Sequence, residues 1–221
     1  MKLQRPGATE TTLVFCDYLK KEKNINDDAL KHSEKVFINW LYSTAGWYDK
    51  SVEGKYFDIN HMQVLESDCY ALWIKEYQRS ILNCDYLIPL IQPWPLNGHM
   101  QYYEEYLKYL APRNSENTTL EAYWTKHVNL YPFLENKKIL VVSSFAELIS
   151  QQFRSNDLYG AYPNFPKLEK LVPLTFPYTF FNSGPHQNSF ETIDAVFSEI
   201  SMIDFDVALV SCGAYGAILV E

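Results

Sequence analysis

Two glycines stand in the turn that follows the last apolar run of the chain. The segment reads FDVALVSCGAYG, from Phe205 to Gly216. At the carboxyl end of a parallel strand, Gly213 and Gly216 would let the backbone approach a diphosphate closely. Glycines at this spacing also occur where a tight turn needs them for structural reasons alone. The pattern indicates either a phosphate site or a structural turn.

Two serines follow an earlier apolar run, in the segment VVSSFAEL. Ser143 and Ser144 would stand at the start of a helix, where free N–H groups and the helix dipole favour an anion. Ser144 and Glu147 also have the S-x-x-E spacing of a capping box. Ser144 is therefore either an anion ligand or only a helix cap.

A compact polar group lies near the amino terminus, in the segment RPGATE. The guanidinium of Arg5 can clamp phosphate oxygens, and the carboxylate of Glu10 can hold a metal, a sugar hydroxyl or a proton. The alternative is an exposed turn with ordinary surface charges.

Asp204 and Asp206 have the D-x-D spelling of many metal-dependent sugar transferases. However, the apolar run comes after them, so both aspartates would lie at the amino end of the strand. Ligands of open α/β sheets bind at the other end. We therefore predict that this pair is not a metal site.

The elements that would position these residues change character near residue 136. Before it, helical patterns dominate, and Asp27 or Asp28 is a candidate N-cap. After it, apolar runs alternate with helical patterns, which predicts right-handed parallel crossovers. The predicted helices before residue 136 are 27–42, 61–82 and 99–112; the later strands are 137–144, 170–178 and 205–210, and the later helices are 144–153 and 189–200.

These patterns predict an α/β fold, with a Rossmann-like parallel sheet and a helical N-terminal half that covers or flanks it. We expect one domain over 1–221, with a mainly helical part in 1–135 and a βαβαβ part in 136–221. The run 205–210 is expected to be a buried strand. Two prolines in 170–178 favour a sheet edge or a strand end for that segment.

Composition narrows the class of protein. The formal net charge of −8 argues against a nucleic-acid partner, since such partners require basic surfaces. No apolar run approaches the length of a transmembrane segment, and no signal peptide is recognisable. The four cysteines are scattered, which favours reduced thiols and a cytoplasmic location. Aromatic residues make up 16% of the chain, and they either fill the core or line a stacking surface.

Four segments, taken in order, resemble the glycosyltransferases with a GT-D-like fold, a group related to the DUF1792 glucosyltransferases. They are RPGATE, STAGWYD, KKILVVSSFAELISQQF and DFDVALVSCGAYG. The resemblance runs from Arg5 to Glu221. It implies a Rossmann-like sheet, a nucleotide-sugar donor, a glycan acceptor such as a surface or capsule-type polysaccharide, and often a divalent metal, Mn²⁺ or Mg²⁺.

The resemblance also implies roles for individual residues. Glu10 would be the catalytic residue and, where a metal is used, its ligand, although Ala8 stands where relatives have an aspartate. Tyr215 would stack on the sugar or the base. The donor-binding residues would be Arg5, Ser143, Ser144, Gln152, Gly213, Tyr215 and Gly216. Relatives continue beyond the AYG turn into a further strand, so the resemblance implies that this chain is incomplete at its carboxyl end.

Two other functions stay open. One is another Rossmann-like nucleotide-cofactor enzyme, such as a methyltransferase. Against it, no glycine-rich turn follows the run 137–144, and no acidic residue ends the run 170–178. The other is a non-catalytic binding module, which Ala8 favours.

Overall fold

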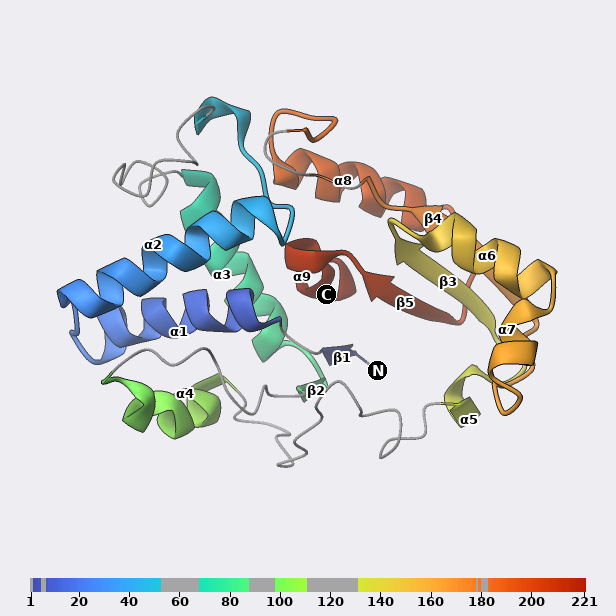
Figure 1. Cartoon of the computed structure of the whole chain (residues 1–221), viewed down its shortest axis with the longest axis horizontal. Helices are drawn as coiled ribbons and strands as arrows, with labels where there is room; N and C mark the ends of the chain where they lie inside the picture. The colour runs from blue at the N-terminus through green and yellow to red at the C-terminus, as the bar shows by residue number, and fades with distance from the viewer. Residues whose placement is uncertain are drawn as a thin grey trace.

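The computed structural model describes residues 2–4, 7–52, 68–87, 98–110, 131–177, 179 and 183–221. A helical part and a sheet part lie side by side, and the last helix, α9, lies between them (Figure 1). This arrangement confirms the predicted α/β fold with a helical N-terminal half. The main helices of these two parts are α1 (Ala8–Glu22), α2 (Asp28–Ser43), α3 (Asp68–Leu82), α4 (Tyr103–Leu110), α6 (Ala146–Arg154), α8 (Ser189–Ile200) and α9 (Gly216–Val220).

Sequence patterns predicted α2, α3 and α4 but missed α1. In α2, the carboxylate of Asp27 accepts a hydrogen bond from the N–H of Leu30 at 2.8 Å, so Asp27 is the N-cap. α1 was missed because it lacks an apolar stripe: all of residues 10–16 are buried, polar and apolar alike. A helix surrounded on all sides carries no amphipathic signal.

The described residues of the sheet part form three parallel strands in the order β4-β3-β5. Their bounds are Lys138–Ser143 for β3, Lys170–Thr175 for β4 and Val207–Ser211 for β5. Pro173 is tolerated because β4 is an edge strand, as predicted. A separate parallel pair joins β1 (Leu3–Gln4) to β2 (Tyr86–Leu87). The shorter elements are η1 (Lys50–Val52), η3 (Met100–Tyr102), α5 (Tyr131–Leu134), α7 (Asp157–Ala161) and η5 (Gly213–Tyr215).

The prediction that 205–210 is a buried strand was wrong in one respect. The segment does form β5, but Ala208 and Leu209 are exposed. β5 is an edge of the described sheet, whereas β3 has a partner on both sides and is almost wholly buried. An apolar run cannot distinguish a central strand from an edge strand, because both need apolar residues on at least one face.

The two faces of the sheet pack against different layers. Leu140, Val142 and Leu174 point into the large core, together with α8 and the N-terminal helices. Ile139 and Val141 point to the other face and meet α6 through Ala146. The helices α6 and α8 therefore cover opposite faces of the sheet. This is expected for right-handed crossovers, because the connection from β3 to β4 and the connection from β4 to β5 run in opposite directions across the sheet.

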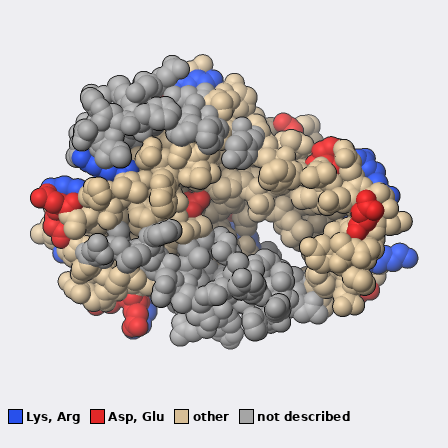
Figure 2. Space-filling model, in the orientation of Figure 1, with Lys and Arg blue, Asp and Glu red and all other residues tan. Residues whose placement is uncertain are grey.

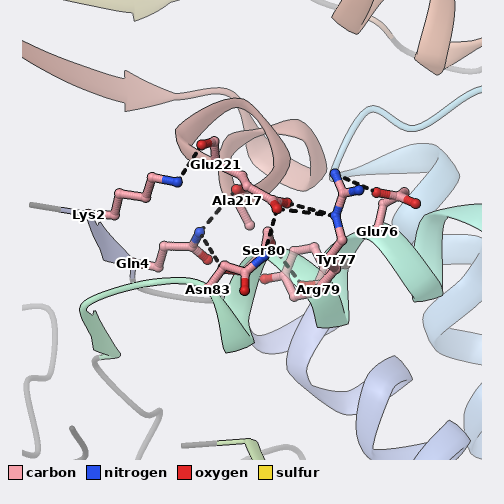
Figure 3. A network of polar contacts seen from close by, with 9 residues as sticks. All are labelled: Lys2, Gln4, Glu76, Tyr77, Arg79, Ser80, Asn83, Ala217 and Glu221. Carbon is pink, nitrogen blue, oxygen red and sulfur yellow. Dashed lines mark hydrogen bonds and ion pairs between the residues drawn. The ribbon is translucent and has the colours of Figure 1, made fainter. Parts of the chain in front are cut away.

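A polar network ties α9 to β1 and α3 (Figure 3). The amide of Gln4 donates to the carbonyl groups of Ser80 and Ala217, each at 3.1 Å. The carboxylate of Glu221 accepts from Asn83 at 2.8 Å and pairs with Arg79 at 3.1 Å. The amino-terminal strand and the last helix are thus held on one side of α3.

Candidate functional site at the carboxyl edge of the sheet

The carboxyl ends of the three parallel strands carry hydroxyl groups. Ser143 of β3 is in register with Thr175 of β4 on one side and with Ser211 of β5 on the other. Residues paired in a parallel ladder point to the same face, so these three side chains form a row. Thr175 and Ser211 are exposed and Ser143 is buried. We call this row, with the turns that follow β3 and β5, the carboxyl edge.

The carboxyl edge contains a topological switch point. After β3 the chain enters α6, which packs on one face of the sheet, and after β5 it enters α9, which packs in the large core on the other face. β3 and β5 are neighbours. Where two adjacent parallel strands send their chains to opposite faces, α/β proteins bind their ligands.

The turn after β3 differs from its predicted form. The helix α6 begins at Ala146, and no side-chain cap stands at its start. Ser143, not Ser144, binds the turn, because its Oγ accepts the N–H of Phe145 at 3.2 Å. Glu147 pairs with Arg154 at 2.6 Å. The predicted capping box of Ser144 and Glu147 was therefore wrong, because the helix starts at Ala146 with Phe145 as its N-cap, which leaves Ser144 outside the helix.

The turn after β5 holds the two predicted glycines at the expected end of the strand. Gly213 has a φ of +54°, and a Cβ there would lie 2.5 Å from the carbonyl oxygen of Ala45. That carbonyl accepts the N–H of Ala214 at 3.1 Å. Glycine is thus required at position 213, because the carbonyl group of Ala45 leaves no room for a Cβ. Gly216 has open space where a Cβ would be added.

Tyr215 lies inside the core, which corrects the expectation that its ring stacks on a ligand. Its side chain is 1% exposed, and the ring packs against Trp47 and Phe176. Its hydroxyl donates to the carbonyl of Gly46 at 2.7 Å. Burial raises the pKa of the Tyr215 phenol well above its ordinary value. Tyr215 anchors the turn to the core, and its buried ring has no face exposed to a ligand.

Gln152 lies away from the carboxyl edge. It is exposed on α6, six residues after the helix begins at Ala146. At 1.5 Å per residue, this places it about 9 Å farther along the helix axis. A role for Gln152 in donor binding stays a prediction that this placement does not favour. Arg5 lies outside the described residues.

Glu10 is buried at the start of α1, with 6% of its surface exposed. Its carboxylate lies over Gly7, at the position where a Cβ on that glycine would stand. The phenol of Tyr77 hydrogen-bonds the backbone of Gly7 and feels the charge of Glu10, and burial raises its pKa well above the ordinary value. The alternative of an exposed turn is excluded for the described Gly7–Glu10 segment.

The helix α3 connects the start of α1 with the turn after β5. Trp73 donates its indole N–H to the carbonyl of Ala214 at 3.2 Å. One turn farther along α3, Tyr77 contacts Gly7, and its ring centroid lies 5.0 Å from that of Trp73. Glu10 and the AYG turn therefore lie against one helix. The structure brings the two strand-end turns together directly, and it joins Glu10 to them through α3.

A divalent metal at Glu10, which the resemblance implied, stays a prediction. Among the described residues, no three His, Cys, Asp or Glu side chains come close enough to hold an ion. Asp204 and Asp206 are engaged at the amino end of β3, where Asp204 pairs with Lys138 at 2.6 Å and Asp206 accepts the backbone N–H of Lys138 at 2.8 Å. A metal at Glu10 would have to be held by this one carboxylate together with the diphosphate of the donor.

Sequence reasoning missed the other residues of the carboxyl edge. Thr175 and Ser211 were not singled out, although each is a hydroxyl residue at the end of an apolar run. Phe145, which follows the two serines, is 64% exposed. The register that aligns them with Ser143 is set by strand pairing, which no local pattern reveals.

A doubly wound parallel sheet with hydroxyl groups at its switch point is the frame of many nucleotide-binding α/β proteins. Residues 100–221 match the GT-D-like family, described as the GT-D fold-like domain. The match covers more than half of the chain, and the protein belongs to this family. No curated protein and no solved structure matches the chain. Within the described residues, no helix is both long enough and apolar enough to cross a membrane.

Proposed function

We propose that this protein is a glycosyltransferase that moves a sugar from a nucleotide-sugar donor to a glycan acceptor. The observation that supports this most is the switch point at the ends of β3 and β5, in a chain that belongs to the GT-D-like family. The donor would bind at the turns that begin with Ser143 and Cys212.

Glu10 is the residue proposed to take part in the transfer. Overall, the acceptor oxygen bonds to the anomeric carbon, the bond from that carbon to the diphosphate oxygen breaks, and the acceptor hydroxyl loses its proton. A carboxylate near the acceptor can take that proton. Burial of Glu10 and its fixed position over Gly7 suit such a role.

Ligand binding tests the class of reaction. Thermal unfolding should be followed with uridine, guanosine and cytidine diphosphate sugars, and separately with S-adenosylmethionine. A ligand at 100 times its Kd adds about 2.7 kcal/mol to the free energy of unfolding. We expect a nucleotide sugar to raise the melting temperature. A rise with S-adenosylmethionine instead would favour a methyltransferase, and no response to any of these ligands would favour a non-catalytic module.

Substitution of Glu10 tests the mechanism. With a nucleotide sugar that binds, Glu10→Gln should lower kcat by about 10²- to 10⁴-fold, the usual contribution of a general base, and leave the donor Kd nearly unchanged. The matched control is Glu22→Gln, at the exposed end of the same helix. Equal rates for the two variants would exclude Glu10 as the base.

A further inference from the structure

Phe145 exposes a large aromatic ring at the carboxyl edge. The residue is 64% exposed, although it lies only two positions after Ser143, the buried end of the central strand. The backbone of Phe145 is held on both sides: its N–H donates to the Oγ of Ser143 at 3.2 Å, and its carbonyl accepts the N–H of Ile149 at 3.0 Å. The ring is therefore presented to solvent by an ordered turn.

Phe145 lies in one of the two turns that form the switch point. It follows β3, which lies between β4 and β5, and the hydroxyl residues Thr175 and Ser211 end the flanking strands in register with Ser143. An apolar platform with a few hydroxyl groups beside it is the usual composition of a site for a small organic ligand.

Charge indicates which part of a nucleotide fits here. The segments 139–153 and 171–221 contain no Lys or Arg, so no cationic side chain follows β3, β4 or β5 at their carboxyl ends. Among the described lysines of the sheet part, Lys137, Lys138 and Lys170 lie at the amino ends of strands and Lys167 lies in the loop before β4. Arg154 reaches back along α6, where its guanidinium is paired with Glu147 at 2.6 Å. On the face seen in Figure 2, most charged side chains lie toward the two ends of the molecule. An aromatic and hydroxyl surface, beside which the cation of Arg154 is already paired with Glu147, suits the base and ribose better than the diphosphate.

We propose that Phe145 is the stacking platform for the nucleobase of the donor, with the neighbouring hydroxyl groups available to the ribose. This inference rests on the proposed function and names the part of the donor that the turn after β3 recognises. Aromatic rings stack on bases without charge complementarity, since every base has a π-face.

Binding of nucleotides and of pyrophosphate to four forms of the full chain tests the proposal. The probe is whichever of uridine, guanosine, cytidine and adenosine diphosphate binds the native protein most tightly by calorimetry. Stacking is worth about 1–3 kcal/mol per base, so Phe145→Ala should weaken that nucleotide by about 5- to 150-fold. Phe145→Trp should keep the affinity within about 3-fold. Inorganic pyrophosphate, which has no base, should bind the native and Phe145→Ala proteins equally.

The matched control is Leu148→Ala, which removes another exposed apolar side chain one turn along the same helix. It should leave nucleotide affinity unchanged. If Phe145→Ala weakens the nucleotide no more than Leu148→Ala does, or weakens pyrophosphate equally, Phe145 does not stack on the base. Should Phe145→Ala unfold, Phe145→Leu supplies the same comparison with an apolar, non-aromatic side chain. A native protein that binds none of the nucleotides would overturn the proposed function, and this inference with it.

Discussion

Tyr215 shows how one side chain can join the two parts of this protein. Its hydroxyl lies 2.8 Å from the Oγ of Ser189 and 2.9 Å from the Oγ1 of Thr179, and it donates to the carbonyl of Gly46. These partners come from a loop of the helical part, the loop after β4 and the start of α8. A family resemblance assigned this residue to the ligand, but its position assigns it to the scaffold under the site.

Loss of this hydroxyl should destabilise the fold. Tyr215→Phe leaves buried polar partners less well satisfied, at a cost of about 1–3 kcal/mol. For a protein of this size that corresponds to a fall in melting temperature of roughly 2–12 °C. Tyr162→Phe, at a side chain that is 58% exposed, is the control. Equal melting temperatures for the two variants would show that the buried hydroxyl network contributes nothing to stability.

At the scale of elements, the turn from β5 into α9 places two glycines in different surroundings. Gly213 has a left-handed backbone and stands against the carbonyl of Ala45, whereas Gly216 is in the right-handed helical region, with φ of −56° and ψ of −45°, beside open space. From their spacing in the sequence, both glycines were expected to serve the same purpose, either a phosphate site or a tight turn. The structure explains why position 213 must be glycine, whereas position 216 has room for a Cβ.

Alanine at these two positions should therefore have effects of opposite sign. Gly213→Ala should lower the free energy of unfolding by at least about 1 kcal/mol, from the left-handed backbone alone. Gly216→Ala should raise it by up to about 1 kcal/mol, because alanine loses less backbone entropy in a helix. Urea unfolding curves of both variants measure this. Equal effects would mean that the contact with Ala45 does not constrain the turn.

At the scale of the whole molecule, a continuous core crosses the boundary near residue 136. Leu140 and Val142 of β3 share it with Leu13 of α1 and Trp73 of α3. Trp47 lies at the junction, where its ring packs against Trp73, Phe190 and Tyr215. A single domain over residues 1–221 stays a prediction, and this continuous core gives it a direct test.

Cooperative unfolding tests that prediction. We expect a single thermal transition, with far-ultraviolet dichroism and tryptophan fluorescence giving the same midpoint. Trp47→Ala should lower that midpoint in both signals by roughly 6–20 °C, because removing a buried tryptophan costs about 3–5 kcal/mol. Two separate transitions, of which Trp47→Ala moves one, would show that the helical part and the sheet part are independent domains.

Local periodicity was enough to predict several elements of this fold. The helices α2, α3, α4 and α8, the cap at Asp27 and the strands β3, β4 and β5 were all predictable, because apolar spacing and capping residues act over a few positions. It also placed Gly213 and Ser143 at strand ends. For the same reason it missed α1, which is enclosed by other helices and has no apolar stripe.

The tertiary structure alone decided which strand ends meet and which side chains remain free. Strand order made β5 an edge of the described sheet and aligned Thr175, Ser143 and Ser211. Long-range packing buried Glu10 and Tyr215. Phe145 stayed exposed, although its backbone N–H is bound by Ser143. These outcomes depend on contacts between residues far apart in the chain, and long-range pairing leaves no mark on local spacing.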